Sequence, residues 1–166
     1  NLEKRGLEPC LAVILVGEDP ASAVYVRNKK RTCEELGIRS VGHDLPETTS
    51  QDELENLVND LNNDPSVHGI LNQFPLPNGL DESRVIRTIS PEKDVDGLNP
   101  LNAGLIAMGQ PSFISCTPYG VLQMLKRSNI STSGKNAVVL GRSNLVGRPI
   151  ATLLSSKGWD STVTVC

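Results

Sequence analysis

The sequence has no long hydrophobic run and no excess of positive charge. Its longest apolar stretch, Leu11 to Val16, is far shorter than the roughly 20 residues that cross a bilayer. Lysine and arginine total 16 against 19 acidic residues, so the formal net charge is -3. A protein that binds nucleic acid through the phosphates normally carries a basic surface. The sequence therefore predicts neither a membrane nor a nucleic acid as a partner.

Cysteine and histidine are scarce and scattered. The chain has 4 cysteines and 2 histidines, with no Cys-x-x-Cys pair and with both histidines well separated in sequence from the cysteines. This spacing supports neither a zinc site nor a disulfide framework. We therefore expect no metal, and we expect a reducing compartment: the cytoplasm or, as the alternative, the mitochondrial matrix.

The length of the chain suits one globular unit or one and a half α/β lobes, since 38% of its 166 residues are hydrophobic and 21% are charged. The sequence starts at Asn1 without a methionine and stops inside a β-like run, Ser161 to Cys166. We expect a piece of a longer protein whose last lobe is incomplete.

Apolar strands and amphipathic helices alternate in the first half. Strands are expected at 11–16, 38–45 and 67–71, and helices at 21–36, 51–61 and 82–89. The first strand is apolar throughout, which is typical of a parallel sheet buried on both faces. Ser50 and Glu53 have the spacing of a capping box at a helix start. This alternation predicts a parallel sheet with right-handed crossovers.

The pattern changes at Ser90, since residues 90–111 are rich in glycine, proline and asparagine, and we expect a lobe boundary near residues 112–120. We expect Thr117 and Pro118 to start a helix at 119–126, followed by a buried strand at 136–140, a helix ending at 157 and a strand from 161. The predicted fold is α/β with two lobes. Residues 1–115 form a three-layer parallel-sheet lobe, and residues 116–166 form the first part of a Rossmann-like nucleotide lobe.

The first candidate site lies on the helix that follows the first strand, at the sheet edge where ligands of α/β proteins bind. Helical residues advance by about 100° each, so Ser22, Tyr25 and Lys29 share one face. Lys30 lies about 140° from Tyr25 by the same geometry. A hydroxyl, a ring and an ammonium on one face suit ligand binding or proton transfer. An isolated Tyr-x-x-x-Lys more often marks a solvated helix face.

Two further candidate sites follow in the same lobe. Gln73 comes directly after the third strand, where Pro75 and Pro77 stiffen the exit loop, so its amide is expected to point into a cleft. Ordinary loop chemistry explains Gln73 about as well. Asp94 and Asp96 lie in a glycine loop, where acids more often cap backbone groups or bind solvent. The Asp96 carboxylate could instead accept two parallel N–H donors from a heterocycle.

The fourth candidate site is the turn Gly141 to Gly147, between a predicted strand and a predicted helix. Backbone N–H groups at such a helix start bind phosphate. The Arg142 guanidinium and the Ser143 hydroxyl could hold a ribose 2′-phosphate, which favours NADP over NAD. The glycine spacing is looser than Gly-x-Gly-x-x-Gly, so ordinary α/β turn chemistry explains the turn about as well.

Taken in order, five stretches resemble the blocks of the bifunctional methylenetetrahydrofolate dehydrogenase/cyclohydrolase family, over a match that runs from Leu11 to Cys166. The stretches are Ser22-x-x-Tyr25-x-x-x-Lys29, Gly69-Ile-Leu-x-Gln73-x-Pro75-Leu-Pro77, Pro91-Glu-Lys-Asp94-Val-Asp96-Gly97, Cys116-Thr-Pro118 and Gly141-Arg-Ser143-x-x-Val-Gly147-x-Pro149. Any one block is modest evidence, but five in the right order and spacing are specific.

The resemblance implies two reactions of one-carbon metabolism in one cleft between the lobes. The first is NADP-dependent oxidation of 5,10-methylenetetrahydrofolate to 5,10-methenyltetrahydrofolate, and the second is hydrolysis of that product to 10-formyltetrahydrofolate. Residues 1–115 would be the folate-binding catalytic lobe, and residues 116–166 would begin the NADP-binding lobe. The resemblance also implies a homodimer, with NAD as the alternative cofactor.

By the same resemblance, Lys29 would be the essential group for water addition, Tyr25 would stack on the folate, and Gln73 would hold Lys29 and tune its charge. Asp96 would grip the amino group and ring N–H of the pterin. Ser22 and Pro75 would complete the substrate site. The cofactor would be bound by Gly141, Arg142, Ser143, Val146 and Gly147.

Three residues depart from the family's usual pattern, namely Asn72, Phe74 and Ser115. The first two flank Gln73, so they leave the cleft shape and the rate open rather than the type of reaction. We expect the 166 residues alone to be inactive. The alternatives are another two-lobed NADP-dependent dehydrogenase of a small metabolite and a non-catalytic folate-binding homologue, which would tolerate loss of Lys29.

Overall fold

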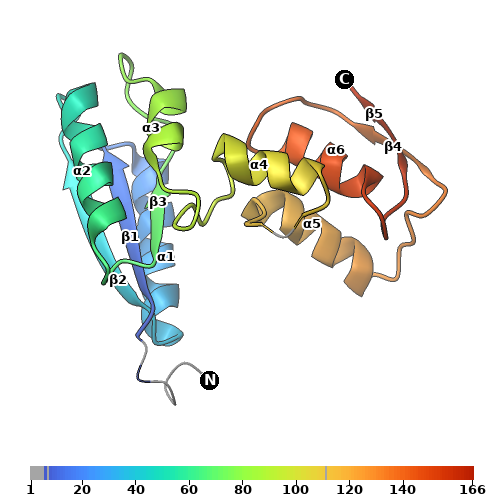
Figure 1. Ribbon diagram of the computed structural model, residues 1–166, viewed down its shortest axis with the longest axis horizontal. Coiled ribbons are helices and arrows are strands. Elements are labelled where there is room, and N and C mark those ends of the chain that lie inside the picture. The colour runs from blue at the N-terminus through green and yellow to red at the C-terminus, as the bar shows by residue number, and fades with distance from the viewer. Residues whose placement is uncertain (1–5, 7, 111) are drawn as a thin grey trace. The chain divides into compact units, whose positions relative to one another are not determined.

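The computed structural model describes residues 6, 8–110 and 112–166, which form two compact units (Figure 1). The first unit ends at Asp94, and the second runs from Val95 to Cys166. Each unit has a hydrophobic core of its own. Every helix within the described residues is too short or too polar to cross a membrane.

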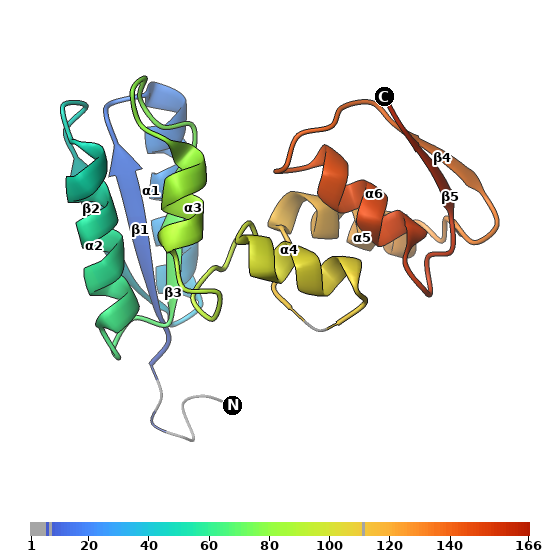
Figure 2. The ribbon, with the colours of Figure 1, turned by 45° about the horizontal axis from the view of Figure 1, so that its top comes forward.

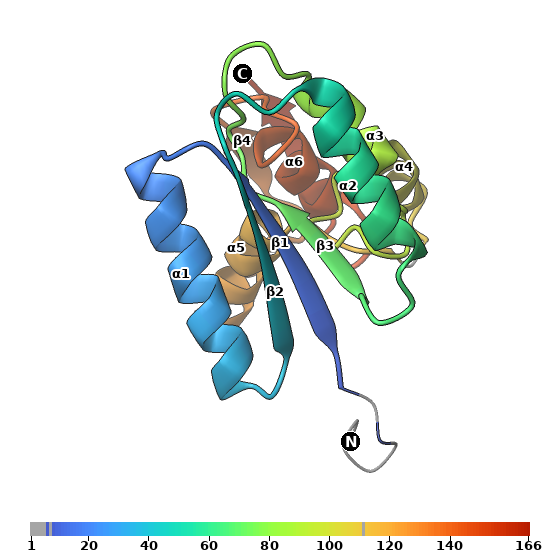
Figure 3. The ribbon, with the colours of Figure 1, turned by 90° about the vertical axis from the view of Figure 1, so that its left-hand side faces the viewer.

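The first unit is a three-layer α/β structure. Its elements are β1 (Cys10–Val16), α1 (Pro20–Glu35), β2 (Arg39–Leu45), α2 (Gln51–Asn63), β3 (Gly69–Asn72) and α3 (Glu82–Thr88). The strands are parallel in the order β2-β1-β3. Helix α1 covers one face of the sheet, and α2 and α3 cover the other (Figures 2 and 3). The predicted three-layer parallel-sheet lobe is confirmed.

The core of this unit lies between β1 and helices α2 and α3. The central strand has its neighbours on both sides, so Ala12 and Ile14 are fully buried. Leu54 and Val58 of α2 are also fully buried, and burial of side chains of this size stabilises a fold by roughly 1.5–3 kcal/mol each. The capping box predicted at Ser50 is present at the start of α2.

The carboxyl edge of the sheet gathers the ends of all three strands. Gly17, directly after β1, donates its N–H to Leu45 O of β2 at 2.9 Å. Gln73, directly after β3, donates its N–H to Ile14 O of β1 at 2.8 Å. Helix α1 begins three residues beyond Gly17 at the same edge. The parallel topology therefore brings the first two candidate sites together.

The second unit is smaller and has two parallel strands. Its elements are α4 (Pro100–Ala107), α5 (Cys116–Arg127), β4 (Asn136–Val139), α6 (Gly147–Ser155) and β5 (Thr162–Val165). Helix α6 lies between the strand pair and helices α4 and α5 (Figure 1). The core of the unit is formed mainly by α6, through Ile150, Leu153 and Leu154, together with Leu122 of α5.

Helix α4 lies within residues 90–111, where the sequence pattern predicted no helix. Asn99 accepts a hydrogen bond from Leu101 N–H at 2.9 Å, and Pro100 occupies the first helical position. The high glycine and proline content of this stretch argued against a helix, so the start of α4 was not recognised from the sequence. Helix α5 also begins earlier than predicted, at Cys116.

The strand predicted at residues 136–140 is confirmed as β4, but the prediction that it is buried was wrong. Ala137 and Val139 pack against the α6 core, but Val138 is 63% exposed and Leu140 is 85% exposed. Alternate residues of a strand point to opposite faces, so the described residues cover one face of β4 only.

Candidate active site

Helix α1 positions the first group of predicted site residues. Asp19 caps the helix by accepting a hydrogen bond from Ser22 N–H at 2.7 Å, and Pro20 starts the first turn. Ser22 is 3% exposed, whereas Tyr25 is 62% exposed. The Asp19 carboxylate therefore caps the helix start, the Ser22 side chain is buried there, and the exposed Tyr25 ring is free to stack on a flat ligand.

Lys29 lies one turn beyond Tyr25 and is half-buried, whereas the neighbouring Lys30 is exposed. The Lys29 Nζ donates a hydrogen bond to Gln73 Oε1 at 3.0 Å. This contact joins α1 to the end of β3 across a separation of 44 residues. Helical phase placed Lys29 rather than Lys30 on the face of Tyr25, and in the structure Lys29 is the lysine that reaches Gln73.

A second hydrogen bond fixes the orientation of the Gln73 amide. Its Nε2 donates to Phe74 O at 2.8 Å, which leaves Oε1 to face the ammonium. Because an ammonium can only donate hydrogen bonds, the oxygen is the side of the amide that can accept from it. The amide is neutral, so it holds the Lys29 Nζ in place without placing an opposite charge beside it.

A hollow of about 360 Å³ lies at the carboxyl edge of the first unit. Its lining residues are Val16, Gly17, Glu18, Asp19, Glu47, Pro75, Leu76 and Pro77. Gly17 has φ 81°, and a Cβ placed on it would lie 3.3 Å from Pro77 Cγ. The β1 exit and the proline loop therefore pack closely, and Pro75 is placed on the wall of a hollow that a ligand could enter.

The segment with the two aspartates runs from the first unit into the second. Asp94 is buried and pairs with Ile70 in a parallel bridge. Asp96 is half-buried and belongs to the second unit. The next residue, Gly97, has φ 64°, and a Cβ there would lie 2.5 Å from Phe113 O. A glycine is therefore required directly after Asp96, and this fixes the path of the backbone that carries its carboxylate.

The turn between β4 and α6 brings two glycines into contact. Gly141 has φ 120°, and a Cβ placed on Gly147 would lie 2.0 Å from Gly141 O. Such close packing lets the chain reverse tightly at the helix start, and residues 141–146 are exposed. This geometry fits the diphosphate of a dinucleotide, because no side chain keeps the ligand away from the glycine backbone.

Ser143 and Arg142 have different roles in this turn. The Ser143 Oγ accepts hydrogen bonds from Val146 N–H at 3.1 Å and Gly147 N–H at 3.4 Å, so its oxygen caps α6. Its hydroxyl hydrogen remains able to donate to a ligand. Arg142 is exposed, and its backbone carbonyl accepts from Arg148 Nε at 3.2 Å. The exposed Arg142 guanidinium places a positive charge at the turn that was predicted to bind the cofactor.

Sequence reasoning missed a second hollow, of about 260 Å³, inside the second unit. It lies between α4, the residues before α5, and the first half of α6, with Ile106, Phe113 and Pro149 among its lining residues. The hollow was missed because α4 was missed, although Asn99-Pro100 is a helix-start signal. Histidines, cysteines and acidic residues in the described part of the chain form no group of three suited to a metal ion.

Two family profiles match the sequence. Residues 1–96 match the catalytic domain of tetrahydrofolate dehydrogenase/cyclohydrolase, and residues 115–166 match the NAD(P)-binding domain of the same family. The bifunctional protein FolD of Caldicellulosiruptor saccharolyticus is 56% identical over 169 residues, which covers 100% of this chain and 60% of that protein. The chain spans about 60% of the length of the curated relatives that it matches.

Solved structures give the same picture. The bifunctional FolD methylenetetrahydrofolate dehydrogenase/cyclohydrolase of Campylobacter jejuni has a TM-score of 0.95 and 48% identity, over 99% of this chain and 58% of that one. The Trypanosoma brucei FolD enzyme, solved with NADP and an inhibitor, has a TM-score of 0.93 and 38% identity, over 99% of this chain and 56% of that one.

Proposed function

The chain belongs to the tetrahydrofolate dehydrogenase/cyclohydrolase family, and on this premise we propose that the protein carrying it has both activities. It oxidises 5,10-methylenetetrahydrofolate to the methenyl form with NADP, and it hydrolyses the methenyl form to 10-formyltetrahydrofolate. The observation that carries the proposal is the hydrogen bond from Lys29 Nζ to Gln73 Oε1 at 3.0 Å. It supports a fixed cationic group at the sheet edge where ligands of such folds bind.

Lys29 and Gln73 serve the hydrolysis. Water adds its oxygen to the methenyl carbon and releases a proton, the bond from that carbon to one ring nitrogen breaks, and that nitrogen gains a proton. The Lys29 ammonium can supply the proton that the ring nitrogen gains, and the amine that it leaves can take up the proton that the water releases. Gln73 holds the Lys29 Nζ in a fixed position during this exchange, so the distance between the proton donor and the substrate stays constant.

Tyr25 and Asp96 bind the substrate in this proposal. The exposed Tyr25 ring stacks on the flat pterin, and the Asp96 carboxylate accepts the amino group and ring N–H as a parallel pair. Ser22 is buried at the start of α1, and Pro75 lines the neighbouring hollow. These are assignments by family resemblance, and the exposure of Tyr25 and the glycine-fixed backbone at Asp96 support them.

The turn Gly141–Gly147 holds the cofactor, which supplies the acceptor for the hydride that leaves the methylene carbon. Gly141 and Gly147 give the backbone its close approach, Ser143 offers its hydroxyl hydrogen, and Arg142 offers its guanidinium to the 2′-phosphate. Val146, the N-cap residue of α6, lies at the edge of the same turn. NADP is favoured over NAD because Arg142 is an exposed cation.

The proposal is tested on the protein that carries this chain at its natural length. Purified protein is given 5,10-methylenetetrahydrofolate with NADP or with NAD, and formation of the methenyl compound, the reduced nucleotide and 10-formyltetrahydrofolate is followed. Turnover with NADP exceeding that with NAD is expected. Absence of oxidation with both nucleotides would end the proposal.

We also propose a homodimer in the cytoplasm. All 4 cysteines are free thiols, which is in keeping with a reducing compartment. Light scattering on the eluting protein gives the mass of the assembly, and fractionation of the source cells gives the compartment. A monomeric mass or a membrane-bound fraction would contradict these assignments.

A further inference from the structure

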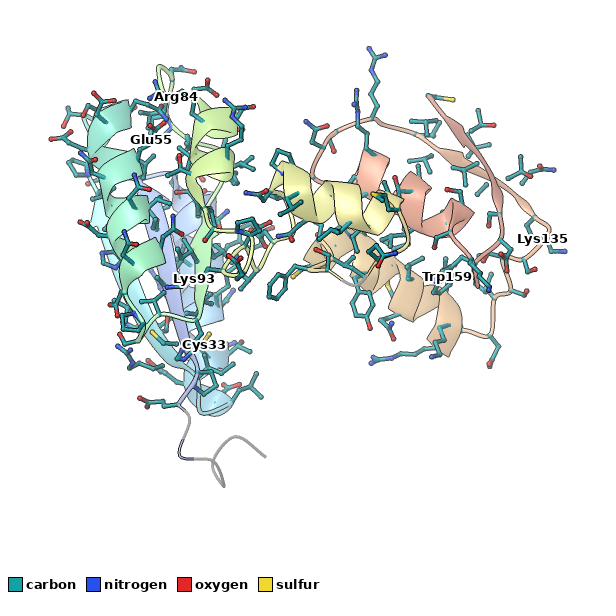
Figure 4. All side chains as sticks on the ribbon, in the orientation of Figure 1. Cys33, Glu55, Arg84, Lys93, Lys135 and Trp159 are labelled. Atoms are coloured by element: carbon teal, nitrogen blue, oxygen red, sulfur yellow. The ribbon has the colours of Figure 1, made fainter. Side chains whose placement is uncertain are left out.

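Lys93 forms two hydrogen bonds that its sequence position does not suggest. Its Nζ donates to Leu61 O at 2.9 Å and to Asp64 O at 2.7 Å, both at the carboxyl end of α2. Figure 4 shows Lys93 at the end of the first unit away from Glu55 and Arg84, which join the opposite end of α2 to α3. The last carbonyls of a helix need donors, and a cation there also interacts favourably with the helix dipole.

Asn62 makes the reciprocal contact from the helix to the loop. Its Nδ2 donates to Thr88 O at 2.7 Å, and its Oδ1 accepts from Ser90 N–H at 2.9 Å. One side chain thus reaches from α2 to the loop after α3, and the other reaches back from that loop to α2. We call Asn62 and Lys93, with their four hydrogen bonds, the α2 clamp.

The α2 clamp holds the backbone that leads to Asp96. Lys93 O accepts from Ile70 N–H at 2.7 Å, and Asp94 pairs with Ile70 in a parallel bridge. Ile70 belongs to β3, the strand that ends just before Gln73. The same strand therefore fixes Gln73 at its end and the start of the aspartate segment along its side. Asp96 follows Asp94 after a single residue.

We propose that Lys93 is a positioning residue for substrate binding, because its ammonium holds the segment 93–96 against α2 and so sets where the Asp96 carboxylate stands. This role rests on the proposed function, in which Asp96 grips the pterin. Lys93 does not touch the substrate in this role. Its loss should weaken binding of the pterin, whereas the Lys29–Gln73 pair, which is held by its own contacts, stays intact.

The test is steady-state kinetics of Lys93→Met in the protein of natural length. Methionine keeps an unbranched apolar stem but removes the ammonium. We expect KM for 5,10-methylenetetrahydrofolate to rise about tenfold with kcat within about twofold of wild type, which is the pattern of lost uniform binding. Lys93→Arg retains a cation for the α2 carbonyls and should restore most of KM. Asn62→Leu, which breaks the other half of the clamp, should raise KM in the same direction.

Lys126→Met is the matched control. Lys126 also lies in the last turn of a helix, α5, but its ammonium makes no hydrogen bond within the described part of the chain. The KM of Lys126→Met should therefore stay at the wild-type value. Hydrogen exchange gives a second readout that needs no substrate. The amide of Ile70, which donates to Lys93 O, should exchange about tenfold faster in Lys93→Met.

The outcomes separate this inference from the proposed function. Wild-type protein without folate turnover overturns the proposed function. A folded Lys93→Met protein with KM within about twofold of wild type overturns the positioning role alone. Loss of kcat without a rise in KM also overturns that role. If Lys93→Met does not fold, the same decision rests on Asn62→Leu and on the rescue by Lys93→Arg.

Discussion

In the first unit the candidate site residues are held by side-chain hydrogen bonds, whereas in the second unit the candidate turn is held by backbone packing. Lys29 and Gln73 come from different layers and meet through an ammonium and an amide. Gly141 and Gly147 meet because neither has a side chain. The first unit can lose the Lys29–Gln73 hydrogen bond and still fold, because its core does not include this contact. The turn in the second unit has no space for a side chain at Gly147. The first unit thus brings polar side chains together, and the second brings backbone groups together.

The largest expected effect is on Lys29, because the proposed chemistry depends on it. Lys29→Ala should lower kcat for hydrolysis of the methenyl compound by about 10²–10⁴-fold, the usual contribution of a positioned proton donor. Folate binding and thermal stability should change little, since the first unit keeps its core. Stopped-flow hydrolysis and folate titration measure the two quantities. Lys30→Ala, one residue away and exposed, is the control, and unchanged hydrolysis in Lys29→Ala would remove the residue from its role.

The Lys29 placement shows how much of the site could be predicted from sequence. Helical phase separated Lys29 from Lys30, and the end of an apolar strand identified Gln73, because both are local periodic signals. Lys93 was missed, since its hydrogen bonds go to backbone carbonyls 29 and 32 residues away, and every residue type provides a carbonyl. Secondary structure was predicted correctly where the hydrophobic pattern was strong, as in the apolar strand β1 and the amphipathic helix α2.

Residues 90–111 and β4 show why the rest of the fold could not be predicted. Helix α4 has the sequence Pro-Leu-Asn-Ala-Gly-Leu-Ile-Ala, which has no clear polar face and contains a proline and a glycine. Its start was signalled only by Asn99-Pro100. The Val138 and Leu140 side chains are apolar and exposed, and composition alone cannot tell which face of a strand another element covers.

The next largest effect is expected at the glycine contact of the second unit. In Gly147→Ala the new Cβ would lie 2.0 Å from Gly141 O, so the turn must open, at a cost of about 3 kcal/mol or more. NADP binding should fall with it. Gly120→Ala in α5 is the control, because its Cβ would meet nothing within 4 Å and alanine should stabilise the helix by about 0.5–1 kcal/mol. Urea unfolding and NADP titration measure both, and native stability in Gly147→Ala would contradict the packing argument.

Two buried asparagines, one in each unit, test the comparison through stability. Asn72 of β3 is 2% exposed, and both of its amide atoms lack a partner among the described residues. Asn102 of α4 is 4% exposed, and its Oδ1 accepts from Ser112 Oγ at 2.7 Å. Asn72→Leu should raise the free energy of unfolding by about 1–3 kcal/mol, and Asn102→Leu should lower it by a similar amount. Chemical denaturation measures the free energy of unfolding of both variants. A change in the same direction in both variants would contradict the predicted difference between the two asparagines.

The smallest effect is expected at the helix caps, where the units also differ. Ser50 and Glu53 cap α2 reciprocally, whereas Ser115 at the start of α5 gives no side-chain cap and donates its hydroxyl to Leu145 O. Ser50→Ala should lower the melting temperature by about 4 °C at neutral pH, because a helix cap is lost. Ser115→Ala should lower it less. Thermal scans of both variants over a range of pH give the comparison.

The pH dependence of that difference follows from Glu53. The backbone N–H of Ser50, and then its hydroxyl, hold the pKa of Glu53 below its ordinary value of 4.5. A carboxylate with a lowered pKa stabilises the fold above its ordinary pKa, and this stabilisation is lost as the pH falls through the folded-state value. The deficit of Ser50→Ala relative to wild type should therefore be constant above pH 4.5 and shrink below it. A deficit that grows on acidification would show that the Ser50 hydroxyl does not stabilise the Glu53 carboxylate.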